Sequence, residues 1–156
     1  MNKMILAFRH MGVVVTSMER AIEFYCDLLE HKIIVDFIEK GEYFNNLIGM
    51  KGAEARVVKA SSPDGSYIEL IEFSDYTDNT FSKQKFSTIG CNHICFTVER
   101  IFELYDRLVE SGVEFISPPL ESDFDPVLTC FCYDPDGTLV QFVEITDHNL
   151  ITKGLD

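Results

Sequence analysis

Four side chains that could ligate a metal ion recur at matching places in two similar stretches of the chain. His10 and Glu69 belong to the first stretch, and His93 and Gln141 occupy the corresponding positions of the second. Each histidine opens an apolar run, and Glu69 and Gln141 each stand four residues after the glycine of a Pro-Asp-Gly turn. Imidazole nitrogens combined with carboxylate or amide oxygens suit a first-row divalent cation. The repeat therefore predicts one metal site to which both halves contribute.

The first half is typical of a β-α-β-β-β order. Runs rich in β-branched and aromatic residues predict strands, and a run with apolar residues three and four apart predicts an amphipathic helix, with Ser17 as its N-cap. Glycines and asparagines predict a looser stretch around 41–52. The predicted strands are 4–16, 32–38, 56–60 and 67–73, and the predicted helix is 18–29.

The same order begins again in the second half, after a polar segment. Gly112 is expected to end the second helix as its C′ residue. The predicted strands are 91–98, 113–116, 127–133 and 138–145, and the predicted helix is 100–110. We therefore divide the chain into a first module (1–78), a linker (79–90), a second module (91–147) and a tail (148–156), forming one structural domain overall.

Composition excludes several classes of protein. The 156 residues carry a formal net charge of −13, which argues against nucleic acid or an anionic membrane surface as a partner. No apolar run approaches the roughly 18 residues of a membrane span, and the first residues do not resemble a signal peptide. The five cysteines are odd in number and lie mostly in strand-like runs. They indicate reduced thiols and a cytoplasmic protein.

The paired modules, the histidine that opens each first strand and the Pro-Asp-Gly-x-x-Ile-Glu-Leu motif resemble the vicinal oxygen chelate superfamily. This group includes glyoxalase I, methylmalonyl-CoA epimerase, extradiol dioxygenases, fosfomycin-resistance enzymes and bleomycin-binding proteins. The resemblance covers residues 8–145 approximately. It implies an α+β fold of two tandem βαβββ modules, whose curled half-barrel sheets surround a metal-binding cleft. It also implies a small-molecule substrate and a homodimer.

The resemblance assigns the ligands of one divalent ion (nickel, zinc, cobalt, manganese or iron) to His10, Glu69, His93 and Gln141. Many members of the family have a glutamate at the position of Gln141. A glutamine can ligate through its oxygen but cannot take up a proton, so Glu69 is the expected catalytic base. Side chains alternate faces along a strand, and a slip of one residue in the last strand would bring Glu144 to the site in place of Gln141.

Three further residues are candidates for contact with the substrate. Arg56 could bind a carboxylate if the face of its strand that carries Val58 lines the cleft, whereas Lys59 points the opposite way; an exposed, ion-paired Arg56 is the alternative. Phe44 and Leu47 lie in the apolar stretch between the second and third strands, which could form a lid or pack into the core.

The cysteines near His93 could in principle hold zinc, but their spacing favours buried thiols.

Three functions are consistent with these residues. The first is a metal-dependent lyase or isomerase of the glyoxalase I and epimerase type, in which a base moves a proton and the substrate becomes an enediolate. The second is an extradiol-type dioxygenase that uses His10, His93 and Glu69 as a two-histidine, one-carboxylate triad. The third is a metal-free protein that binds a drug or metabolite.

Overall fold

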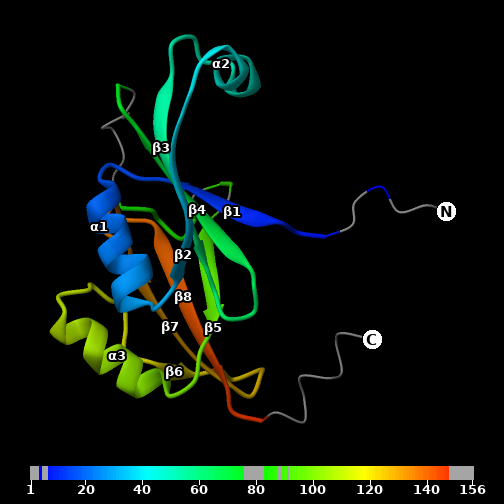
Figure 1. The fold of residues 1–156 in the computed structure, drawn as a ribbon. Helices are drawn as coiled ribbons and strands as arrows, with labels where there is room; N and C mark the ends of the chain where they lie inside the picture. The colour runs from blue at the N-terminus through cyan, green and yellow to red at the C-terminus, as the bar shows by residue number, and fades with distance from the viewer. Residues whose placement is uncertain (1–3, 5–6, 76–82, 88, 91, 148–156) are drawn as a thin grey trace. The chain divides into compact units, whose positions relative to one another are not determined.

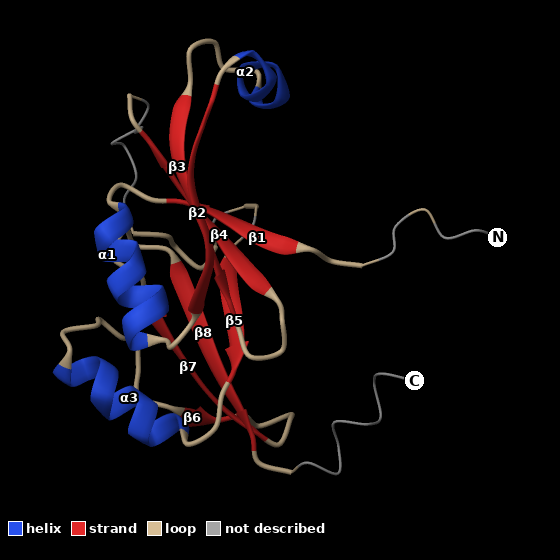
Figure 2. Cartoon of the chain, viewed as in Figure 1, coloured by secondary structure: helices blue, strands red, loops and turns tan. Residues whose placement is uncertain are grey.

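The computed structural model describes residues 4, 7–75, 83–87, 89–90 and 92–147. The chain divides into two compact units, Met1–Thr80 and Phe81–Asp156, each of which contains one four-stranded sheet (Figures 1 and 2). The predicted tail lies outside the described residues, as do Cys91 and part of the predicted linker. No helix among the described residues has the length and apolar character needed to cross a membrane.

The first unit has the predicted β-α-β-β-β order with an additional short helix. Its sheet has the strand order β1-β4-β3-β2, in which β1 runs parallel to β4 and the other neighbours are antiparallel. The helix α1 begins after the predicted cap Ser17, whose hydroxyl accepts from the Arg20 N–H, and continues as the π-helical η1. The elements are β1 (His10–Val14), α1 (Met18–Ile22), η1 (Glu23–Leu28), β2 (Lys32–Lys40), α2 (Glu42–Ile48), β3 (Glu54–Ser61) and β4 (Tyr67–Phe73).

The second unit repeats this topology. Its sheet has the order β5-β8-β7-β6, again with the first and last strands parallel and adjacent. Gly112 follows the helix with a positive φ of 84°, as predicted for a C′ residue. Both sheets are mixed and neither is closed into a barrel, which confirms the predicted α+β class. The elements are β5 (His93–Thr97), α3 (Ile101–Glu110), β6 (Leu120–Glu121), β7 (Val127–Tyr133) and β8 (Leu139–Ile145).

One glutamate in the fourth strand of each unit anchors the helix of that unit. Glu72 Oε1 accepts a hydrogen bond from the Met18 N–H at 3.2 Å. The carboxylate of Glu144 accepts from the N–H groups of Arg100 at 3.1 Å and Ile101 at 2.8 Å. Acids at this end of a helix satisfy unpaired amides and complement the helix dipole. Each helix is thereby tied to the sheet face on which these glutamates lie.

The same face of each sheet holds the apolar core. Ile68 and Leu70 of β4 are buried, as are Val140 and Phe142 of β8, whereas the alternate residues, apart from the buried Leu139, are only partly buried. This alternation follows from the two-residue period of a strand. The opposite face of each sheet is therefore the one on which polar side chains can be placed.

Two elements differ from the prediction. The stretch predicted to be loose contains α2, which begins after Gly41 and ends at Gly49, whose φ of 71° suits a left-handed cap. The strand predicted at 113–116 is reduced to a single bridge between Phe115 and Cys132. The two prolines that follow, at 118 and 119, cannot donate to a ladder, and pairing resumes only in the two-residue β6.

Candidate functional site

The face of the first sheet that points away from the core carries a group of polar side chains that contact one another: His10, Lys59, Tyr67 and Glu69. Across the parallel β1–β4 ladder His10 is the partner of Tyr67, and across the β3–β4 ladder Lys59 is the partner of Glu69. Tyr67 and Glu69 are two apart on β4, so all four side chains share one face. We call these residues the polar cluster.

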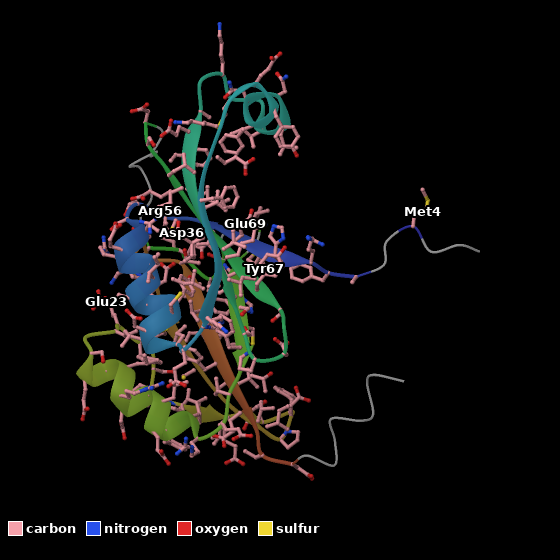
Figure 3. All side chains as sticks on the ribbon, in the orientation of Figure 1. Met4, Glu23, Asp36, Arg56, Tyr67 and Glu69 are labelled. Atoms are coloured by element: carbon pink, nitrogen blue, oxygen red, sulfur yellow. The ribbon has the colours of Figure 1, made fainter. Side chains whose placement is uncertain are left out.

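The polar cluster is linked by short contacts between its side chains. Glu69 Oε1 lies 3.8 Å from His10 Nε2, and Glu69 Oε2 lies 3.2 Å from Lys59 Nζ. On the other side of the imidazole, His10 Nδ1 is hydrogen-bonded to the Tyr67 hydroxyl at 3.2 Å, and the two rings stack. Figure 3 shows Glu69 and Tyr67 together along β4. Each oxygen of Glu69 thus faces a different neighbour.

The chemistry of His10 and Glu69 fits a divalent metal. Histidine nitrogens and carboxylate oxygens bind zinc at about 2.0–2.2 Å, so two ligands of one ion can be as much as about 4 Å apart. The 3.8 Å between His10 Nε2 and Glu69 Oε1 lies within that span. The hydrogen bond between His10 Nδ1 and Tyr67 is the kind of outer contact that orients ligating histidines. Lys59 opposes this fit, because its ammonium group already pairs with Glu69.

The equivalent face of the second sheet is neutral and aromatic. Gln141 donates from Nε2 to the Thr129 hydroxyl at 3.0 Å, which leaves its carbonyl oxygen as the atom with ligand character. The His93 ring packs against Phe86 and Phe131, with centroid distances of 5.9 and 5.5 Å. We call Phe86, His93 and Phe131 the aromatic cluster. Phe131 pairs with Gln141 across β7 and β8 and therefore occupies the position that Lys59 has in the first unit.

The register of β8 decides between Gln141 and Glu144. In the parallel β5–β8 ladder His93 is the partner of Leu139. Gln141 lies two residues after Leu139 on β8, so it shares the face of His93. The slip that would exchange them does not occur. Glu144 lies on the opposite face, where it caps α3. The structure thus places Gln141, and not Glu144, on the sheet face of His93.

Arg56 lies on the other face of the first sheet from the polar cluster. Its Nε and Nη2 atoms donate to the two oxygens of Asp36 at 3.0 and 2.9 Å, and its Nη1 atom donates to Glu19 at 2.8 Å (Figure 3). The hydrogen bond from Arg56 lowers the pKa of Asp36. Val58, whose face would have to line a cleft for Arg56 to reach a substrate, is fully buried. This geometry corresponds to the ion-paired alternative.

Phe44 and Leu47 of α2 differ in their surroundings. Phe44 is buried in a small cluster with Ala53 and Ala55, and its ring stacks on Phe73. Leu47 is 64% exposed. Phe44 therefore packs as a core residue, whereas Leu47 remains accessible; their contact with a substrate stays a prediction.

Two of the four described cysteines are buried apolar residues. Cys130 and Cys132 lie in the core of the second unit, and burial raises the pKa of Cys130 to about 11. Cys95 is exposed on the face of Gln141, and Cys91 is outside the described residues. Among the residues that the structure describes, no three His, Cys, Asp or Glu side chains group as a metal site. Each unit therefore holds at most part of a ligand set.

Lys59 and Tyr67 are the members of the polar cluster that sequence analysis did not assign to the site. Tyr67 shares the face of Glu69 by the alternation along β4, and its contact with His10 follows once β1 pairs with β4 in parallel. Lys59 was recognised only as pointing away from Arg56. Its contact with Glu69 depends on the register between β3 and β4, which strand parity alone does not provide.

The model of the Glyoxalase/Bleomycin resistance protein/Dioxygenase superfamily matches residues 7–142. No curated protein matches the sequence.

Three solved structures illustrate the likeness of fold. A glyoxalase family protein from Bacillus cereus superimposes with a TM-score of 0.80 at 24% identity, covering 92% of this chain and 95% of its own. A glyoxalase/dioxygenase from Nostoc punctiforme has a TM-score of 0.68 at 17% identity, with 94% and 100% covered. The fosfomycin resistance protein FosX from Listeria monocytogenes has a TM-score of 0.62 at 17% identity, with 90% and 94% covered.

Proposed function

The chain belongs to the glyoxalase/bleomycin resistance protein/dioxygenase superfamily, and we propose that it is a divalent-metal-dependent lyase or isomerase of the glyoxalase I and epimerase type. Its substrate would be a small molecule that chelates through two neighbouring oxygens. His10 and Glu69 are the proposed ligands from the first unit, and His93 and Gln141 those from the second.

The matched register of the two units is the observation that carries this proposal. In each unit the histidine opens the first strand and pairs with the residue two positions before Glu69 or Gln141. An imidazole and an oxygen donor therefore stand on the same face of both sheets. Single histidines and acids on strands are common, but four in matched register favour a shared role over coincidence.

Glu69 would act as the base. A carboxylate positioned beside the substrate carbon can remove its proton and return it, whereas the amide of Gln141 cannot. A divalent ion bound by these residues would supply a Lewis acid that polarises both substrate oxygens. Removal of the proton by Glu69 leaves the substrate as an enediolate. Thr129 would hold the Gln141 amide in one orientation through its hydroxyl.

Metal content tests the ligand assignment. The protein is purified without a chelator or a nickel column, and its metals are measured by elemental analysis. We expect about one divalent ion per chain, and His10→Ala and His93→Ala should each lower occupancy strongly. His31→Gln is the matched control, because the hydrogen bonds of His31, to Ser62 and to the Leu29 carbonyl, involve no member of the polar cluster. Full occupancy in both alanine variants would refute the assignment.

A metal-free binding protein is the second candidate, and one observation favours it. The ammonium of Lys59 holds Glu69 in an ion pair without any metal. An apolar ligand could then bind near the aromatic cluster, where Phe86 is exposed. This candidate predicts no stoichiometric metal in the wild-type protein, so the same elemental analysis distinguishes the two functions.

We also propose a cytoplasmic homodimer. Cys26, Cys95, Cys130 and Cys132 are free thiols, which a reducing compartment maintains. The edge strand β2 exposes apolar side chains (Ile33, Ile34, Val35 and Ile38), and edges of this kind are commonly covered by a partner. Light scattering that showed a stable species near 17.8 kDa at micromolar concentration would refute the dimer.

A further inference from the structure

We propose that Lys59 recognises an anionic group of the substrate, so that the substrate carries a carboxylate or another oxyanion beside its two chelating oxygens. This inference rests on the proposed function and specifies its substrate class. It follows from the position of Lys59, from the partners of the neighbouring cations and from the charge that a bound metal would bring.

Lys59 contacts two other members of the polar cluster. Its Nζ atom lies 3.2 Å from Glu69 Oε2 and 5.7 Å from the centre of the Tyr67 ring. Its side chain is 27% exposed, so the ammonium remains accessible to a small molecule. An ammonium group has three donors, and a single carboxylate oxygen does not occupy all of them. The remaining donors can bind the oxygens of an anion.

Two other basic residues of β2 and β3 are engaged elsewhere. Arg56 is held by Asp36 and Glu19, and Lys40 pairs with Glu54 at 3.2 Å. Both belong to the opposite face of the sheet, as the β2–β3 and β3–β4 registers show. Lys59 is therefore the cation that the register of β3 directs to the face of Glu69.

Metal binding would change the charge balance around Lys59. Without a metal, the carboxylate of Glu69 neutralises the ammonium. With a divalent ion bound to Glu69, two positive centres would share one carboxylate at short range, where their repulsion is appreciable. An anionic group on the substrate would compensate this excess positive charge and replace Glu69 as the partner of Lys59. A neutral substrate would leave the repulsion uncompensated.

The second unit lacks this feature at the equivalent position. Phe131 pairs with Gln141 as Lys59 pairs with Glu69, and its ring packs against His93. A phenylalanine cannot donate to an anion. Recognition of the anionic group is thus expected to depend on the first unit.

Two hydroxamates serve as probes. Both bind metals through two neighbouring oxygens, but acetohydroxamate carries no further charge, whereas the monohydroxamate of malonic acid carries a carboxylate. Their binding to the cobalt-loaded protein is measured by isothermal titration calorimetry. We expect the wild-type protein to bind the charged probe about tenfold more tightly than acetohydroxamate, because its carboxylate can accept a charge-assisted hydrogen bond from Lys59. Lys59→Met and Lys59→Gln should abolish the preference, and Lys59→Arg should retain most of it.

Lys40→Met is the matched control, because it removes a lysine from the opposite face and should keep the preference. Equal binding of both probes to the wild-type protein would overturn the role of Lys59 and leave the proposed function standing. A preference that persisted in both Lys59→Met and Lys59→Gln would do the same. Failure of the wild-type protein to bind cobalt, or either probe, would refute the proposed function and this inference with it.

Discussion

The two units have the same topology and nearly the same register, but the faces that carry their histidines differ in chemistry. In the first unit Glu69 is flanked by Lys59 and His10. In the second unit the corresponding Gln141 is flanked by Phe131 and bonded to Thr129. One face is charged and the other is neutral and aromatic.

This difference teaches that the face with the helix-capping glutamate is kept alike in the two units, whereas the chemistry of the other face varies. The buried face keeps apolar residues in both units, and it keeps the glutamate that caps the helix. These features preserve packing and topology. The other face is less completely buried at the equivalent positions of β3 and β7, where a lysine stands in one unit and a phenylalanine in the other. The following predictions test the comparison, beginning with the largest expected effect.

Replacement of Glu69 by glutamine should have the largest effect, because it makes the first unit resemble the second. General bases contribute about 10²–10⁴ to rates, and turnover should fall by that amount while some metal stays bound through the amide oxygen. Gln141→Glu should keep the metal and could broaden activity toward hemithioacetals by restoring a second base. The measurement is exchange of a substrate hydrogen with deuterated solvent, followed by NMR.

Glu54→Gln is the control for this experiment, because Glu54 pairs with Lys40 on the opposite face. Wild-type exchange in Glu69→Gln would contradict the enediolate mechanism. The dioxygenase and binding-protein hypotheses would then be favoured. Oxygen consumption in the presence of substrate would distinguish them, because only a dioxygenase consumes oxygen.

Truncation of the equivalent core residues should destabilise both units. Leu70 of β4 and Phe142 of β8 occupy matching buried positions. Leu70→Ala should cost about 2–5 kcal/mol and Phe142→Ala about 3–5 kcal/mol of unfolding free energy, measured by urea denaturation and circular dichroism. The exposed Leu47→Ala should change stability by less than about 0.5 kcal/mol. A negligible effect at either buried site would show that the two cores are not equivalent.

Loss of the helix-capping glutamates should have a smaller effect that differs between the units. Glu144 accepts from two backbone amides, at 3.1 and 2.8 Å, whereas Glu72 accepts from one at 3.2 Å. Each alanine substitution should lower the unfolding free energy by about 1 kcal/mol, with the larger loss for Glu144→Ala. Asp106→Ala, an exposed change within α3, serves as the control in thermal unfolding. The reverse order of the two losses would contradict the geometric argument.

The smallest effect concerns the pH dependence contributed by His31. Burial lowers the pKa of His31, so the folded protein resists protonation of this side chain. Below the ordinary histidine pKa of about 6.5 the unfolded chain takes up a proton that the folded chain does not. Stability should therefore fall as the pH decreases below this value, by at most about 1.4 kcal/mol per pH unit, and should be unaffected by His31 above it.

Urea unfolding of the wild-type protein and of His31→Gln, measured between pH 5 and pH 8 (a range chosen around the ordinary histidine pKa), isolates this contribution. The difference in stability between the two proteins should shrink as the pH falls. An unchanged difference across this range would contradict the assignment. Among the described residues, the second unit has no equivalent of this histidine contact. Ser62, the partner of His31, corresponds to Asp134 in the second unit. Asp134 accepts hydrogen bonds from the amides of Asp136 and Thr138 within its own turn.

The sequence by itself determined the repeat, the strands that carry it and the faces of Glu69 and Gln141. These features are local: alternation along a strand depends only on its two-residue period, and the Pro-Asp-Gly turns set where each fourth strand begins. The helices and their caps at Ser17 and Gly112 were likewise readable from short-range patterns. The short helix α2 was missed because its glycines and asparagines predicted a loop.

Only the tertiary structure decided which side chains meet. The sequence pointed to Arg56 as the cation for a substrate and placed Lys59 on the opposite face. In the structure the helix covers the face of Arg56, and the register of β3 against β4 brings Lys59 to Glu69. In the same way, the sequence allowed Glu144 as a ligand, but in the structure its carboxylate caps α3. Such contacts join residues that are distant in the chain. They depend on strand register and on helix packing, which are properties of the whole unit and not of any local pattern.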